Sequence, residues 1–164
     1  MANLVEVIVS TANAVEIITG TDVAIEPVGG TSLIEVIAQG PAGTPGTATA
    51  NFIIDGGGSA ILPGVKGSLV IPFNCVIAGW SLMADAVGSI QIDIWKSSFA
   101  NYPPTVANTI SPSNKALISA AVKATFTDLT GWTTAISAGD VLVFKVDSAT
   151  TISRVTLGLS LNRT

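Results

Sequence analysis

The chain has 164 residues and a formal net charge of −4, and 48% of its residues are hydrophobic while only 11% are charged. Ordinary soluble domains carry about 25% charged residues, so this composition is typical of a β protein that buries surface against copies of itself. The sequence contains no histidine and one cysteine, Cys75, which excludes an internal disulfide framework and any metal site built from several cysteines.

Residues 1–39 predict a series of short strands. Turn-forming residues separate four β-branched runs: VEVIVS (5–10), VEIITG (15–20), VAIEPV (23–28) and IEVIAQ (34–39). Both faces of the first run are largely apolar, and a unit of this size is too small to bury two such faces alone. We therefore expect residues 1–39 to oligomerise and to dock on another protein.

The charge of this segment is entirely acidic. Residues 1–39 contain five acidic residues and no lysine or arginine, which argues against nucleic-acid binding and favours docking on a basic protein surface. The side chains expected to mediate this attachment are Leu4, Glu6, Ile8, Glu16, Ile18, Glu26 and Glu35.

Residues 40–50 begin with GPAGTPG, in which glycine recurs at every third position. This is the Gly-X-Y pattern of collagen, where glycine fits the crowded axis of three chains and proline pre-sets the extended conformation. Two triplets cannot hold a triple helix alone, but three chains already joined on both sides need only a narrow crossing. The pattern predicts a homotrimer, and an ordinary linker is the alternative. The residues expected at the trimer axis are Gly40, Pro41, Gly43, Pro45 and Gly46.

Residues 51–164 predict a β-sandwich. Strands are expected at 68–73, 76–85, 89–96, 115–126, 140–147 and 151–161. The segment 115–126 has a helical alternative because of its Ala, Leu and Lys content, IDGGGSA (54–60) predicts a hinge or a tight turn, and 99–113 predicts a long loop. About eight strands with one long crossing loop indicate an all-β, jelly-roll-like sandwich.

Strict alternation predicts which residues form the core of this sandwich. One face of each of three runs is apolar: Ile90, Ile92 and Ile94; Leu142, Phe144 and Val146; and Val155, Leu157, Leu159 and Leu161. We expect Trp80 in the core, whereas Trp95 lies on the face opposite Ile90, Ile92 and Ile94 and is expected at a subunit interface or exposed.

The sequence offers little for catalysis. The acids of the sandwich are scattered, no histidine is present to activate a serine or threonine, and no cofactor or metal ion is expected. We therefore predict that the protein is not an enzyme. Two aromatic residues near loops, Tyr102 and Trp132, are candidates for receptor binding or for packing, because loops carry recognition and aromatic faces stack on sugars.

Taken together, these segments resemble the fibre proteins of tailed bacteriophages. The resemblance rests on the apolar acidic head, on GPAGTPG, and on the stretches IIDGGGSAILPGVKGSLVIPFNCVIAGWSLMAD, GSIQIDIWKSSFANYPPT and LTGWTTAISAGDVLVFKVDSATTISRVTLGLSL. It implies a trimeric virion component with an N-terminal attachment segment, a collagen-like stretch and a β-sandwich tip. The collagen-like part is far shorter here than in long fibres, so the sequence predicts a stub of a fibre.

The function expected from this resemblance is structural. The chain would be a homotrimeric tail fibre on the surface of the phage particle, anchored to a tail or capsid protein through residues 1–39. Its tip, residues 51–164, would contact a host-surface glycan or protein. A head fibre or decoration protein bound to the capsid is the first alternative, and a free carbohydrate-binding lectin is the second. No apolar run reaches the roughly 18 residues of a spanning helix, so membrane insertion is not expected.

Overall fold

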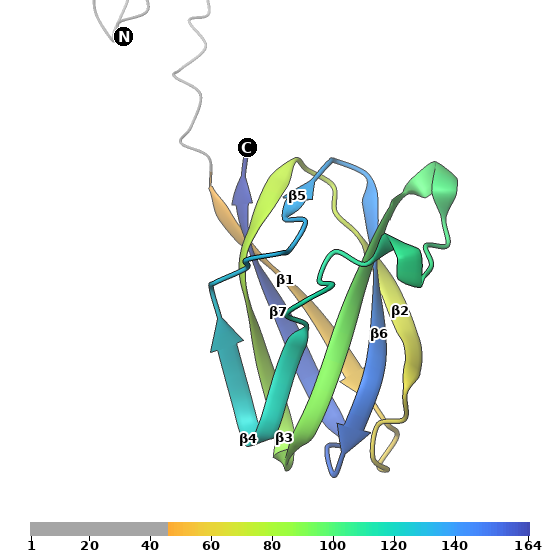
Figure 1. The fold of residues 1–164 in the computed structure, drawn as a ribbon, viewed down its shortest axis with the longest axis vertical. Coiled ribbons are helices and arrows are strands. Elements are labelled where there is room, and N and C mark those ends of the chain that lie inside the picture. Colours follow the sequence, from red (N-terminus) through yellow and green to blue (C-terminus); the bar gives the residue numbers. More distant parts are fainter. Residues whose placement is uncertain (1–45) are drawn as a thin grey trace, which may run out of the picture. The chain divides into compact units, whose positions relative to one another are not determined.

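The computed structural model describes residues 46–164, which form an all-β unit (Figure 1). Residues 1–39, predicted to mediate attachment, and the linker residues before Gly46 lie outside the described residues. The strands are β1 (Thr47–Asp55), β2 (Gly64–Val70), β3 (Cys75–Ser98), β4 (Ala116–Phe126), β5 (Ala135–Ile136), β6 (Asp140–Thr150) and β7 (Arg154–Arg163), and two 3-10 turns, η1 (Phe99–Asn101) and η2 (Val106–Asn108), follow β3.

The long strand β3 reverses its direction near its middle. Residues 75–84 pair antiparallel with β7, and residues 89–98 pair antiparallel with β6. Since β6 and β7 run in opposite directions, the two halves of β3 do so as well (Figure 1). A Cβ atom at Gly88 would lie 2.4 Å from the carbonyl oxygen of Thr150, so only glycine allows this close approach at the bend.

Strand β4 bends in the same way, and the sheet therefore curls on itself. Residues 116–118 of β4 pair with the second half of β3, residues 123–126 pair with its first half, and Ala120 between them has a φ of 48°. One row of strands is then β1, β7, the first half of β3 and the second half of β4. The other row is β2, β6, the second half of β3 and the first half of β4.

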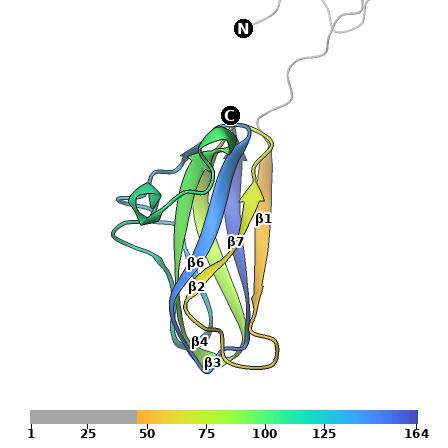
Figure 2. The same ribbon diagram turned by 90° about the vertical axis from the view of Figure 1, so that its right-hand side faces the viewer.

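The inner faces of these two rows share one hydrophobic core, and Figure 2 shows the rows from the side. Phe52 of β1 stacks on Phe144 of β6 with ring centroids 4.3 Å apart, which joins one row to the other. The alternation read from the sequence is confirmed, because all ten apolar residues of the faces at 90–94, 142–146 and 155–161 are buried. Trp80 and Cys75 are buried as well, and burial raises the pKa of the Cys75 thiol.

The ends of the sandwich differ in how their strands are connected (Figure 1). Short turns join the strands at one end, among them the turn after β1, where Gly57 and Gly58 have φ of 67° and 84°. The other end carries the loop 99–115 and the segment between β4 and β6. The chain enters β1 at this same end, where the carbonyl oxygen of Gly46 accepts a hydrogen bond from the N–H of Arg163.

Two expectations about the strands are corrected. Strand β1 begins at Thr47, so the sandwich starts before residue 51, and the Thr and Ala residues of 47–50 pair with β7. β2 begins and ends earlier than the predicted strand 68–73, since it spans Gly64–Val70. The strand expected at 115–126 is confirmed, and its helical alternative is not. Within residues 46–164, no helix has the length and apolar character needed to cross a membrane.

Candidate functional site

The two aromatic candidates from the sequence lie in different surroundings. Tyr102 follows η1, and about half of its surface is exposed (52%). Trp132 is 9% exposed, and its indole N–H donates a hydrogen bond of 2.7 Å to the carbonyl oxygen of Asn114. The Trp132 ring therefore packs within the sandwich and offers no face to a ligand, whereas Tyr102 stays a candidate.

The long loop 99–115 follows β3 and carries the candidate Tyr102. The loop 99–115 is at the end of the sandwich where Gly46 leads into β1 (Figure 1). The opposite end is built from the turns near residues 56–63, 84–89, 119–121 and 151–153. Between Gly46 and this loop the chain crosses the sandwich an even number of times, through β1, β2 and the two halves of β3. Because each crossing takes the chain to the other end, it returns to the end where it started.

The expectation that Trp95 is exposed or at an interface is also corrected. Its outward-facing ring packs with Val141 and Val143 in a second small cluster and is 9% exposed. The chain's own loop covers this face, because Trp95 pairs with Thr109 and the N–H of Ile110 donates to the carbonyl oxygen of Ile94 at 2.8 Å.

A buried carboxylate, Asp93, fastens this loop to the sheet. Its side chain is 1% exposed. Oδ1 accepts hydrogen bonds from the hydroxyls of Thr109 (2.6 Å) and Ser111 (3.2 Å). Oδ2 accepts one from the indole N–H of Trp95 (3.0 Å) and lies 3.0 Å from Nζ of Lys115. Both oxygens are thus satisfied, as a buried charge requires.

The charge network continues along the sheet. Nζ of Lys115 donates to Oδ2 of Asp147 at 2.6 Å, and Nζ of Lys145 donates to Oδ1 of the same carboxylate. Burial alone would raise the pKa of Asp93, but hydrogen bonds from Thr109, Trp95 and Lys115 and the charge of Lys115 outweigh it, so the pKa is lowered. The pKa of Asp147 is lowered for the same kind of reason.

These shifts give a prediction for the pH dependence of stability. Both carboxyls have a folded-state pKa below their usual 3.8. Their contribution to the free energy of unfolding is therefore fully present above pH 3.8 and is lost as the pH falls through the folded-state pKa. We expect the free energy of unfolding to hold from neutral pH to about pH 5 and to decrease below it. Urea titrations at several pH values measure this, and Asp93→Asn should flatten the decrease. An equally steep decrease in that variant would contradict the assignment.

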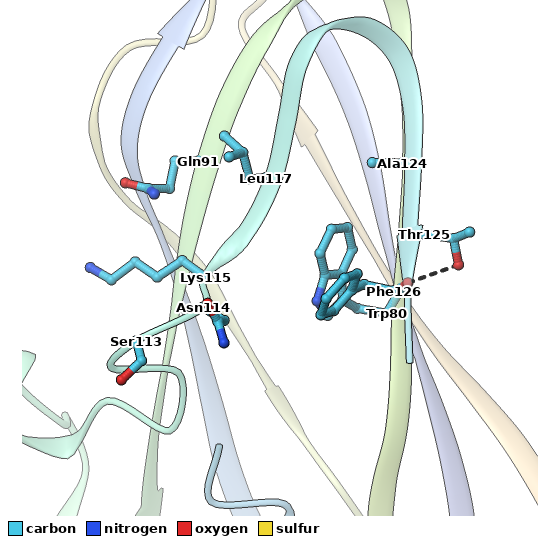
Figure 3. A pocket seen from close by; sticks show the side chains of 9 residues that line it. All are labelled: Trp80, Gln91, Ser113, Asn114, Lys115, Leu117, Ala124, Thr125 and Phe126. Carbon is cyan, nitrogen blue, oxygen red and sulfur yellow. Dashed lines mark hydrogen bonds between the residues drawn. The ribbon is translucent and has the colours of Figure 1, made fainter. Parts of the chain in front are cut away.

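An open groove lies between the two halves of β4 (Figure 3). It has a volume of about 360 Å³. The residues that line it are Trp80, Gln91, Ser113, Asn114, Lys115, Leu117, Ala124, Thr125 and Phe126. The rings of Trp80 and Phe126 stack with centroids 6.0 Å apart, and the Thr125 hydroxyl donates to the Trp80 carbonyl oxygen at 3.1 Å. Because β4 is the last strand of both rows, the groove opens at an edge of the sandwich.

Sequence reasoning missed this groove. It assigned Trp80 to the core, which is confirmed, and singled out neither Leu117 nor Phe126, which are 42% and 43% exposed. The groove exists because β4 bends at Ala120, and that bend has no glycine or proline to signal it.

No group of three or more acidic or cysteine side chains that could hold a metal ion lies within residues 46–164. Comparison with models of known protein families finds no match to this chain, and comparison with curated proteins finds none either.

Proposed function

We propose that the curled sheet is a jelly roll. The order of its strands supports this, because strands that follow one another in the chain lie in alternate rows, except that the second half of β3 and the first half of β4 are neighbours in the same row. If each half of β3 and β4 is counted as one strand, the rows have four strands each, which is the eight-strand arrangement of that fold.

We further propose that the protein is a non-enzymatic structural component of a phage particle. In this proposal it is a homotrimeric tail fibre that is anchored by residues 1–39 and exposes the sandwich at the particle surface. The observation that carries the proposal is the direct passage from Gly-X-Y triplets into the sandwich, since Gly46 is followed at once by β1. Gly46 is exposed, and a Cβ atom built there would meet nothing within 4 Å, which leaves room for neighbouring chains.

The tip's proposed role is to contact a host-surface glycan or protein. The loop that carries Tyr102 lies at the end where the chain enters, so the surfaces that remain for a receptor are the opposite end and the sides of the sandwich. Tyr102 stays a candidate only for a contact near the anchored end. A capsid-bound head fibre is the alternative, in which the arm docks on the shell and the tip binds no receptor. A free lectin is the third possibility, and the acidic arm argues against it.

The linker provides a test of the trimer. We expect Gly43→Val to reduce trimer formation strongly and Ala42→Val to leave it almost unchanged, because only glycine fits the axis of three chains whereas the Y position, which Ala42 occupies, points outward. Light scattering on the two purified full-length variants measures the molar mass. Equal masses for both variants would show that the GPAGTPG segment is an ordinary linker.

A further inference from the structure

The groove between the two halves of β4 combines an aromatic wall with polar groups of both hydrogen-bonding kinds. Phe126, Trp80 and Leu117 supply the apolar side. Gln91 and Asn114 supply side-chain amides, which donate and accept hydrogen bonds. We infer that this groove binds a neutral sugar residue, whose hydroxyls meet the polar groups while an apolar face of its ring packs on Phe126.

The strongest sign of a missing partner is the indole N–H of Trp80. This residue is 6% exposed, and its Nε1 is buried without a hydrogen-bond partner among the described residues. Leaving a buried donor unpaired costs free energy, so such groups call for a partner. The other two tryptophans, Trp95 and Trp132, both donate their N–H to an oxygen.

Trp80, which carries this N–H, is one of the residues that line the groove. Figure 3 draws the Trp80 ring beside Phe126 and across the groove from Asn114 and Leu117. Phe126 ends the edge strand β4, is 43% exposed and stacks on Trp80, so the inference requires this ring to move aside on the solvent side. An oxygen of a bound ligand then reaches Nε1, and the Phe126 ring covers the ligand's apolar face.

The charges of the groove select among ligands. Among residues 46–164, Lys115 is the single charged residue that lines it. Its ammonium group lies 3.0 Å from a carboxylate oxygen of Asp93 and 2.6 Å from one of Asp147, and these two anions compensate its charge. An acidic sugar or a phosphate therefore gains little in this groove, which favours a ligand without charge. The volume of about 360 Å³ is near the lower end of small-molecule sites, roughly 300–1,000 Å³, and suits one sugar residue of a chain.

The biological role of this groove rests on the host-surface recognition proposed above. The inference adds the class of ligand, a neutral sugar. The binding itself is tested on the purified full-length protein. Glucose, galactose, mannose and N-acetylglucosamine are titrated to millimolar concentrations while the three indole N–H signals are followed by NMR. Trp80→Phe identifies the Trp80 signal.

We expect at least one of these sugars to move the Trp80 signal in a saturable way and to leave the Trp95 signal in place. Glucuronic acid, the charged counterpart of glucose, should bind more weakly than the neutral sugar. Trp80→Phe, which keeps an aromatic ring but removes the N–H, should weaken binding about fivefold by saturation-transfer NMR on the sugar signals. Phe126→Ala should weaken it as well, whereas Phe99→Ala, an exposed phenylalanine on η1, should not.

Three results would overturn the inference. The first is no movement of the Trp80 signal with any of the four sugars, and the second is glucuronic acid binding as tightly as glucose. The third is a Trp80 signal that moves with protein concentration alone, which would make the groove a contact between copies of this chain. The mass of the trimer and its incorporation into particles are measured separately and do not depend on sugar binding. Failure of the sugar-binding inference is therefore distinguishable from failure of the proposed function.

Discussion

Removal of residues 1–39 is expected to leave a folded sandwich that no longer joins the particle. Within residues 46–164, the buried core cluster runs from Ile54 to Leu161, and the strands that build it pair with one another. The sequence predicts that the acidic arm is the part of the chain whose apolar faces need a partner. We therefore expect loss of incorporation with little loss of stability in the sandwich.

The measurement is incorporation into particles assembled with the truncated chain in place of the full one. The Ala42→Val chain is the matched control, because it carries the whole arm and a substitution at a position expected to be neutral. Urea unfolding of the truncated chain, followed by tryptophan fluorescence, shows whether its sandwich is folded. Normal incorporation of a folded, truncated chain would place the anchor on the sandwich itself.

The second large effect is expected at Asp93. Asp93→Ala removes the acceptor for two hydroxyls, one indole N–H and the ammonium group of Lys115. Breaking a buried pair by removing one partner typically costs about 3–5 kcal/mol. Lys115 keeps Asp147 as a partner, so the loss comes mainly from the two hydroxyls and the indole N–H that are left without an acceptor. We expect a decrease of about this size in the free energy of unfolding, together with release of the loop 99–115 from the sheet.

Urea unfolding of the full chain measures the loss, and hydrogen exchange at the amides of Ile94 and Ile110 reports on the loop. Asp128→Ala is the matched control. Within the part of the chain that the structure describes, its exposed carboxylate accepts hydrogen bonds only from the N–H and hydroxyl of Thr130, two residues away, so we expect a change of about 1 kcal/mol or less. Equal losses in the two variants would mean that Asp93 is not a special support of this loop.

Much of the fold follows from local patterns in the sequence. Alternation of apolar and polar residues in 89–96, 140–147 and 151–161 predicts the buried faces, because a half-buried strand has a strict period of two. The same rule fails for Trp95 and Asp93. Both lie on the face that alternation assigns to the outside, and they are buried because a loop from later in the chain covers them. Such a contact between distant segments leaves no local pattern.

The candidate groove is less predictable for a related reason. It depends on the bend of β4 at Ala120, which takes a positive φ without the glycine that usually marks such a position. It also depends on the pairing of both halves of β4 with β3, which no run of residues specifies by itself. The position of the loop 99–115 at the Gly46 end follows from counting strand passages, and that count requires the reversal of β3 to be known.

The most direct test of the proposed function is to look for this chain in intact phage particles, where the proposal places it. Cryo-electron microscopy should show a projection with threefold symmetry in which three copies of the sandwich, residues 46–164, stand outside a base formed by residues 1–39. A projection on the tail supports the tail fibre, and one on the capsid supports the head fibre. Particles that lack this chain, or a projection built from a single copy, would contradict the account.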